Sequence, residues 1–212
     1  MHNPLKNSLI VIIFCIVLAS IDPLDWHSYL LHQIGTVFLM LPMAYLFIKH
    51  KISTKSLYAM TAFLLLHILG AKYLYSYVPY DDWSKYLFNI SISETFNFKR
   101  NHYDRLVHFA YGVCLYPLIY DLIKHWFKTN SQKQLVFIVL TVNMATSMLY
   151  ELFEWFLAIG LSPKQAEQYN GQQGDMWDAH KDMALALIGA VLSSFVYPNY
   201  KACQCKPTQY TP

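Results

Sequence analysis

Six long apolar segments limit what this chain can fold into. Each has close to the roughly 20 mostly apolar residues that an α-helix needs to cross a bilayer. Only 14% of the 212 residues are charged, whereas an ordinary soluble domain carries about 25%. The sequence therefore predicts an all-α, polytopic membrane helix bundle with about six transmembrane helices. The expected spans are residues 5–21, 30–48, 57–75, 106–127, 135–159 and 179–197.

The charges of the connecting segments predict how the bundle is oriented. Lysines without acids mark the second and fourth connections, whereas the first, third and fifth connections contain acids. Short loops rich in Lys and Arg face the cytoplasm. We therefore expect both termini in the cytoplasm and connections one, three and five outside. In this interpretation residues 1–200 form a single six-span membrane domain, and residues 201–212 form a short cytoplasmic tail.

The third connection, residues 76–103, is long and aromatic. Pro79, Asp81 and Trp83 suggest a turn followed by a short helix at the membrane interface, where Trp and Tyr are favoured. The lipid bilayer is the expected partner of the protein. A formal net charge of +3 is too small to indicate a nucleic-acid partner, and no pattern in the sequence indicates an oligomeric state.

Ionisable side chains gather near the start of the fourth span. Asp104 and His108 are four residues apart, so they share one helix face, and Tyr111 extends that face by one turn. Arg105 lies on the flank of this face, three residues before His108. Ionisable groups in or near a membrane span are costly without partners, so such a group of residues indicates a functional site.

Further acids belong to the last two spans. Near the end of the fifth span, Glu151 and Glu154 are three residues apart and share a face. If the sixth helix starts near Asp175, then Asp175, Asp178 and Asp182 form one stripe along it. These residues extend the set of candidate functional acids beyond the fourth span.

The predicted topology brings all of these acids together at the outer end of the bundle. The fourth and sixth spans start there, and the fifth span ends there. The third span also ends there, with His67 and Lys72. Six carboxyl groups are therefore expected to share one end of the bundle with at least two histidines and Arg105.

Three interpretations of this convergence are open. In the first, Arg105, Lys72 and Lys181 pair with some of the acids in a structural ion-pair network. The acids outnumber these bases, however, and unpaired buried carboxylates have to take up protons. In the second, the acids form part of a path for protons or cations, although the inner halves of the spans are nearly bare of ionisable groups. In the third, the outer end holds an enzyme active site.

The active-site interpretation favours a divalent metal ion, because carboxylates and histidine are ligands of Zn, Mn and Mg. Without a metal, a carboxyl group can act as a general acid or base. Arg105 can bind a phosphate or carboxylate of the substrate, which we expect to be a lipid-linked or cell-envelope molecule. The predicted catalytic residues are Asp104, His108, Glu151, Glu154, Asp178 and Asp182, and all of these except Asp104 are candidate metal ligands. The predicted substrate-binding residues are Arg105, Tyr111, Asp175 and Lys181.

The sequence resembles the YjdF-like inner-membrane proteins of bacteria. The resemblance rests on the segments "HYDRLVHFAYG", "YELFEW" and "GDMWDAHKDMALALIGA", and it extends over the whole six-span chain. It implies a multi-pass protein of the bacterial cytoplasmic membrane, and it does not point to a particular activity.

A more distant likeness connects the sequence to the VanZ-like proteins, which act in glycopeptide antibiotic resistance. Their pattern has an acid and a His near a Tyr, then a Glu on a later helix, then acids that open a final helix ahead of a Gly. This chain departs from the pattern at Met183 and Ala186, which stand near where VanZ-like proteins tend to carry an Asn. The likeness implies a role in the cell envelope by analogy. The similar positions are Asp104, His108, Tyr111, Glu151 or Glu154, Asp178, Asp182 and Gly189.

Overall fold

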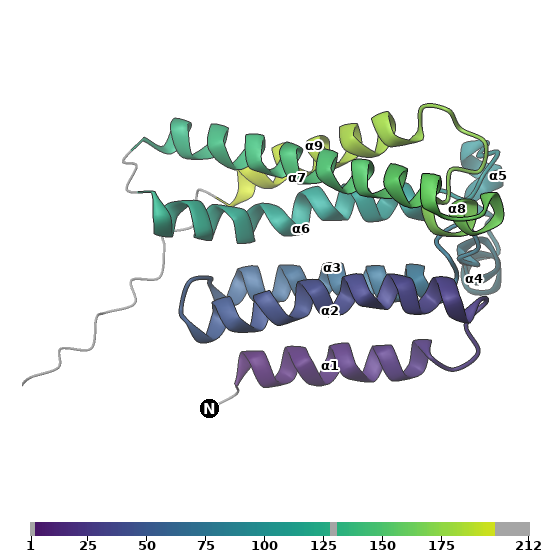
Figure 1. Ribbon diagram of the computed structural model, residues 1–212, viewed down its shortest axis with the longest axis horizontal. Coiled ribbons are helices and arrows are strands. Elements are labelled where there is room, and N and C mark those ends of the chain that lie inside the picture. The colour runs from purple at the N-terminus through teal and green to yellow at the C-terminus, as the bar shows by residue number, and fades with distance from the viewer. Residues whose placement is uncertain (1–2, 128–130, 198–212) are drawn as a thin grey trace, which may run out of the picture.

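A computed structural model of the protein describes residues 3–127 and 131–197, and these residues form nine α-helices and no strand. The six long helices lie side by side, and the short helices gather at one end of them (Figure 1). The long helices are α1 (Pro4–Ala19), α2 (Trp26–Ile48), α3 (Thr54–Lys72), α6 (Tyr103–Trp126), α7 (Gln132–Gly160) and α9 (Asp178–Val196). The short helices are α4 (Tyr80–Phe88), α5 (Ile92–Phe96) and α8 (Pro163–Asn170).

The long helices confirm the prediction of a polytopic helical membrane bundle. Within the described residues, α2, α3, α6, α7 and α9 are long and apolar enough to cross a membrane. The remaining long helix, α1, is apolar but has only 16 residues, which corresponds to a length of roughly 24 Å. The predicted tail, residues 201–212, lies outside the described residues.

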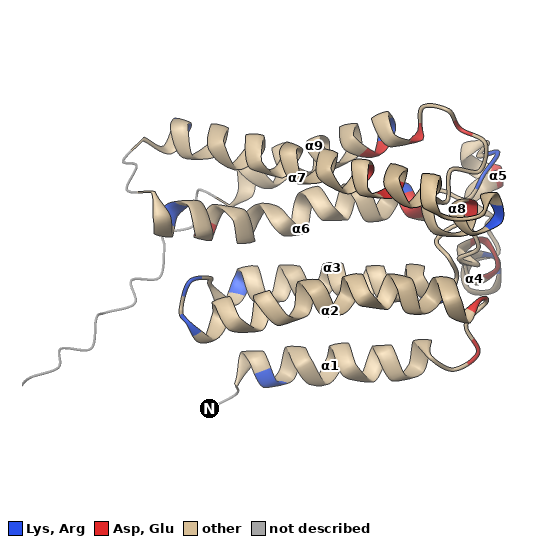
Figure 2. Cartoon of the chain, viewed as in Figure 1, with Lys and Arg blue, Asp and Glu red and all other residues tan. Residues whose placement is uncertain are grey.

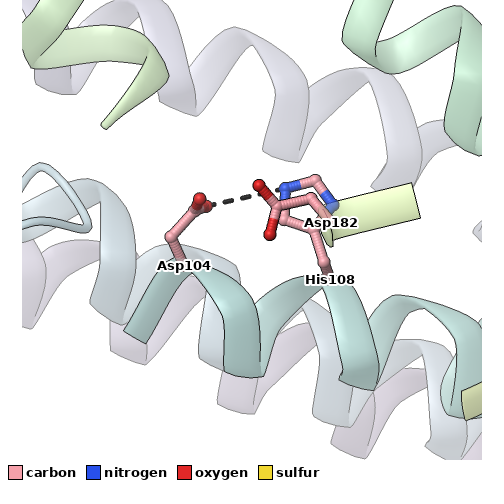
Figure 3. A group of neighbouring side chains, drawn as sticks. All are labelled: Asp104, His108 and Asp182. Carbon is pink, nitrogen blue, oxygen red and sulfur yellow. Dashed lines mark ion pairs between the residues drawn. The ribbon is translucent and has the colours of Figure 1, made fainter. Parts of the chain in front are cut away.

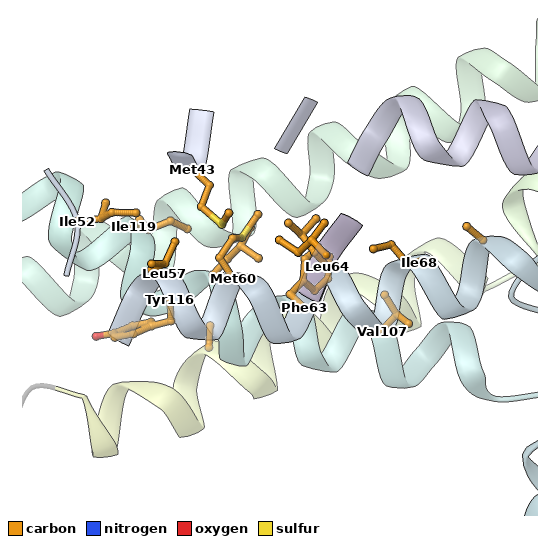
Figure 4. Packing of buried hydrophobic residues seen from close by; sticks show 14 of the residues in the cluster. Met43, Ile52, Leu57, Met60, Phe63, Leu64, Ile68, Val107, Tyr116 and Ile119 are labelled. Carbon is orange, nitrogen blue, oxygen red and sulfur yellow. The ribbon is translucent and has the colours of Figure 1, made fainter. Parts of the chain in front are cut away.

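The apolar core lies around α3 and α6. Helix α3 contacts α1, α2 and α6, and α6 in turn contacts α7 and α9. Leu57 and Leu64 of α3 and Tyr116 of α6 are fully buried in the core, and Figure 4 shows how the side chains of these helices interlock. The two halves of the bundle, α1 to α3 and α6 to α9, therefore meet along the α3–α6 contact.

Helices α6 and α9 run in the same direction and approach each other very closely. A Cβ atom added at Gly112 would lie 1.9 Å from the carbonyl oxygen of Ala186, and one added at Gly189 would lie 2.3 Å from that of Phe109. Side chains larger than hydrogen therefore do not fit at these two positions. Because the two glycines fix the register of α6 against α9, they also fix which residues meet at the N-terminal ends of these helices.

Helix α3 ends at Lys72, three residues before the predicted end of its span. Leu74 and Tyr75 have positive φ angles of 50° and 56°, which stop the helix. The chain then folds back, and the Tyr75 N–H donates to the Gly70 carbonyl over 2.8 Å. A Cβ atom at Gly70 would lie 2.8 Å from the Tyr75 ring, so this turn needs a glycine there.

The connections at the end of the bundle that we expect to face outward contain the three short helices. The third connection forms α4 and α5, which confirms the predicted short helix, and the exposed side chains of Tyr86, Leu87 and Phe88 suit a membrane interface. Helix α8 has no counterpart among the elements that the sequence predicts. Its start is well specified, because Ser162 and Gln165 form a capping box and Pro163 occupies the first turn.

Most of the acids lie at the end of the bundle that carries α4, α5 and α8, whereas the second connection, the end of α6 and the start of α7 lie at the opposite end, near the start of α1 (Figure 2). We expect the end with α4, α5 and α8 to face outward. A reporter inserted after His50 should then behave as cytoplasmic, and one inserted after Asn89 as exported. The test compares alkaline phosphatase and fluorescent-protein fusions of equal abundance. The reverse pattern would place the acids on the cytoplasmic side and contradict the predicted topology.

Candidate functional site

Asp104 and His108 of α6 and Asp182 of α9 form the centre of the candidate site (Figure 3). All three side chains are buried, and one potential ligand atom from each lies within 4.8 Å of the others. Asp104 lies in the first turn of α6, where the helix dipole favours a carboxylate. The three residues meet because α6 and α9 start at the same end of the bundle and stay in contact.

The imidazole of His108 lies between two carboxyl groups. Its Nε2 atom is 3.6 Å from Oδ1 of Asp104, and its Nδ1 atom is 3.6 Å from Oε1 of Glu151 on α7. These distances are longer than those of good hydrogen bonds. The ring is therefore held near both acids and is free to use one nitrogen for a ligand and the other for an acid.

Two buried carboxyl oxygens at this site have no hydrogen-bond partner among the described residues. They are Oδ1 of Asp182, whose residue is 2% exposed, and Oε1 of Glu151, whose residue is 8% exposed. A buried carboxylate without a partner is costly unless a cation or a proton compensates its charge. Asp104, His108, Glu151 and Asp182 are called the acid–histidine group below, and the ion pairs found for this group in the described residues all involve His108.

Asp175 and Asp178, by contrast, are paired with bases. Nη1 of Arg100 lies 2.6 Å from Oδ1 of Asp178, and Nη2 of Arg105 lies 2.9 Å from the same oxygen. Nη2 of Arg105 also lies 2.7 Å from Oδ2 of Asp175, and Nζ of Lys181 lies 2.6 Å from it. These five residues are called the paired group below. The cluster that the sequence predicted as one site is therefore divided into a paired part and an unpaired part.

Asp175 does not begin the last helix, as the predicted stripe supposed. Gln173 and Gly174 have positive φ angles of 50° and 79°, so α9 starts only at Asp178. Asp175 is instead held by its contacts. The pKa of its carboxyl is kept well below its usual range by hydrogen bonds from the Lys181 side chain, the Trp177 backbone N–H and the Arg105 side chain. Asp175 therefore stays ionised at physiological pH and fastens the connection before α9 to α6.

Glu154 and Tyr111 lie beside the acid–histidine group rather than in its centre. Glu154 is one turn nearer to the outer end of α7 than Glu151, and its side chain is partly exposed in a groove between α7 and α9. The Tyr111 hydroxyl donates a hydrogen bond of 2.6 Å to Oγ1 of Thr146 on α7. The roles predicted for Glu154 and Tyr111 stay predictions.

His67 and Lys72 do not join the acids, which corrects the expectation that the third span contributes to the site. The Nε2–H of His67 donates to the His32 carbonyl over 3.0 Å, and the Tyr75 hydroxyl donates to its Nδ1. Nζ of Lys72 donates to the carbonyl of Ile21 over 2.6 Å. These contacts arise because the outer end of α3 lies against α1 and α2.

Three residues of the site and its surroundings are absent from the sets that the sequence predicts. Arg100 precedes α6 in the third connection, so no helical periodicity links it to the acids that it binds. Asn143 and Ser147 share the face of α7 that carries Glu151, at intervals of four residues. They are 0% and 2% exposed, and their side-chain polar atoms have no partner in the described part of the chain. Their spacing was visible in the sequence, but uncharged residues give a weak signal inside a span.

The fold and the site together define a polytopic helical membrane protein with a buried acid–histidine group at one end of its bundle. A family model described as a predicted membrane protein (DUF2238) matches residues 5–201, and the chain belongs to that family. This result confirms the predicted YjdF-like family and a multi-pass location in the inner membrane.

One curated relative is the inner membrane protein YjdF of Escherichia coli (strain K12), which is 28% identical over 142 residues. The alignment covers 67% of this chain and 64% of the relative, so it spans less than two thirds of the relative's length. No solved structure matches the chain. None of these matches extends to the VanZ-like proteins, and that likeness stays a hypothesis.

Proposed function

We propose that the acid–histidine group binds a divalent metal ion, and that the protein is a metal-dependent enzyme acting at the outer face of the membrane on a lipid-linked or cell-envelope substrate. One observation carries the proposal. The buried Asp182 carboxylate has an unpartnered oxygen, and it lies beside Asp104 and His108, which offer further ligand atoms within 4.8 Å. A cation at this point would satisfy that oxygen and offset the charge of the acids.

The geometry suits a metal ion with mixed oxygen and nitrogen ligands. Metal–ligand bonds of about 2.0–2.2 Å allow two ligands of one ion to lie up to roughly 4.4 Å apart. The 3.6 Å between Oδ1 of Asp104 and Nε2 of His108 falls within this limit. With the metal at Nε2, the Nδ1–H of His108 would face Glu151, and a carboxylate at the second ring nitrogen orients a metal-binding histidine.

A metal ion at this position would supply Lewis-acid chemistry, either by polarising a substrate oxygen or by activating a water molecule. Hydrolysis or group transfer is the reaction class that follows. Arg105, predicted from the sequence to bind an anionic substrate group, has its Nη2 atom in contact with Asp175 and Asp178, so we assign it a positioning role instead. Arg105 therefore orders the connection that leads into α9.

The second candidate function is a path for protons or cations across the membrane. The residues that precede Glu151 on the same face of α7 test this candidate. Ser147 and Asn143 extend the polar face inward by two turns. The next residues on that face, Val139 and Leu135, are apolar and buried at 0% and 3% exposed. The polar face therefore stops inside the bundle, which favours a binding site over a route across the membrane.

Metal analysis of the purified protein tests the proposed function. The chain, purified in a neutral detergent and then loaded with Zn, Mn or Mg, is expected to retain about one ion per chain. At 100 times the dissociation constant, the metal should stabilise the folded state by about 2.7 kcal/mol. Asp182→Asn should abolish both the retained metal and the stabilisation. The measurements are elemental analysis after desalting and the Tm with and without metal.

The matched control is Asp82→Asn, which removes an exposed carboxylate of α4 outside the site and should leave metal binding unchanged. Glu151→Gln should keep the stoichiometry and weaken the affinity by about 10–100-fold, as expected for a residue that orients a ligand. Wild-type protein that retains none of the three metals would refute the proposal, and so would an Asp182→Asn variant that binds metal normally.

A further inference from the structure

Between α7 and α9, a groove of about 260 Å³ opens beside the acid–histidine group. Its walls are apolar and include Met148, Leu152 and Trp155 of α7 and Met183 of α9. These three wall residues of α7 are 40–57% exposed on the lateral surface of the bundle. In a bilayer this surface meets hydrocarbon, so a molecule can reach the groove sideways from the lipid.

The polar part of the groove is acidic. Glu151, Glu154 and Asp178 line it, and none of its eleven lining residues, all in the described part of the chain, is basic. Asp178 is already bound by Arg100 and Arg105. Glu151 differs, because its buried Oε1 atom has no hydrogen-bond partner in the described residues. The groove thus combines hydrocarbon-facing walls with the carboxyl group of Glu151, one oxygen of which lacks a donor.

We infer that this groove binds an amphiphile with an ammonium head group, whose hydrocarbon tail lies along the apolar walls. The head would bind Glu151 and Glu154 by charge-assisted hydrogen bonds, and the ring of Trp155 suits a nearby cation. An anionic head would face three carboxyl groups at close range and is disfavoured. The volume equals that of roughly nine water molecules, which fits a head group and the first part of a chain.

In the proposed enzyme this amphiphile would be the substrate, and that assignment rests on the proposed function. Binding of the amphiphile to the groove does not require the metal. Glu154 and Met183 line the groove but do not belong to the acid–histidine group. Asp104 and Asp182 belong to that group and do not line the groove. The two ideas can therefore be tested on separate residues.

The experiment uses metal-free protein in a neutral detergent at pH 7 and three probes with the same tail: decylamine, decyl phosphate and decanol. An alkylammonium group is protonated at this pH, as the side chain of Lys is. We expect decylamine to raise the Tm by several degrees and the other two probes to leave it unchanged. Glu154→Gln should weaken decylamine binding by at least about tenfold, and Met183→Trp should abolish it by filling the groove.

Glu94→Gln is the matched control, because Glu94 lies on α5 at the same end of the bundle and forms an exposed ion pair with Lys85. It should bind decylamine as the wild type does. Equal stabilisation by decanol or decyl phosphate would overturn the inference, as would unchanged binding by Glu154→Gln. Stabilisation by no probe, with two chains per particle in size-exclusion chromatography, would assign the groove to a second copy of the chain instead.

Metal content measured on the same samples separates this inference from the proposed function. Asp182→Asn should lose metal and keep decylamine binding, whereas Glu154→Gln should keep metal and lose decylamine binding. If the wild-type protein binds decylamine but takes up no metal, the inferred ligand of the groove is supported and the proposed metal-dependent enzyme is refuted.

Discussion

Asp178→Asn is expected to destabilise the folded protein by about 3–5 kcal/mol, because it removes one of the two carboxylates that pair with two largely buried guanidinium groups. Oδ1 of Asp178 lies 2.6 Å from Nη1 of Arg100 and 2.9 Å from Nη2 of Arg105. The side chains of these arginines are only 11% and 14% exposed. Asn keeps the shape of Asp but not its charge, so both cations would stay buried without full compensation. The measurement is the Tm and the yield of folded protein in detergent.

Asp182→Asn makes the same chemical change one turn further along α9, but it should not destabilise the folded protein. Its Oδ1 atom has no hydrogen-bond partner in the described residues, and it faces the carboxyl group of Asp104. Without metal, removing this charge relieves repulsion, so stability should stay unchanged or rise. If both variants lose folded protein to the same extent, the division into a paired group and an acid–histidine group is wrong.

Gly112→Ala is expected to cost about 3 kcal/mol or more, since overfilled contacts between helices are destabilising. The added Cβ atom would lie 1.9 Å from the backbone oxygen of Ala186 and 2.8 Å from the backbone nitrogen of Ala190. Backbone atoms cannot rotate away as a side chain can, so α6 and α9 would have to separate. Because the acid–histidine group draws on both helices, metal binding should be lost together with thermal stability.

The control for this change is Gly35→Ala in α2. A Cβ atom there would lie 3.6 Å from the ring of His67, an ordinary contact distance, so the Tm should change little. The comparison uses the Tm and the metal content of both variants at equal protein concentration. A Gly112→Ala variant as stable as Gly35→Ala would show that α6 and α9 do not depend on this close approach.

The long helices could be predicted from the sequence because the signals are local, whereas their orientation in the membrane stays a prediction. An apolar run of sufficient length predicts a span wherever it occurs, and lysine-rich connections alternate with acidic ones along the chain. The errors in the predicted spans lie at helix ends, because a few backbone angles decide where a helix begins or ends. The positive φ angles of Leu74 and Tyr75 end α3 early, and those of Gln173 and Gly174 delay the start of α9. Such angles leave little trace in hydropathy.

The sequence by itself determined that acids from three spans share one end of the bundle, because helical spacing and the alternation of the spans place them there. Only the tertiary structure decided which of them have partners. Asp178 and Asp182 look alike in the sequence, yet the first meets Arg100 and Arg105 and the second meets Asp104 and His108. That difference depends on the register of α6 against α9, which the glycine contacts fix across a long sequence separation. Local periodicity carries no information about such a register, so the unpaired site could be found only in the folded chain.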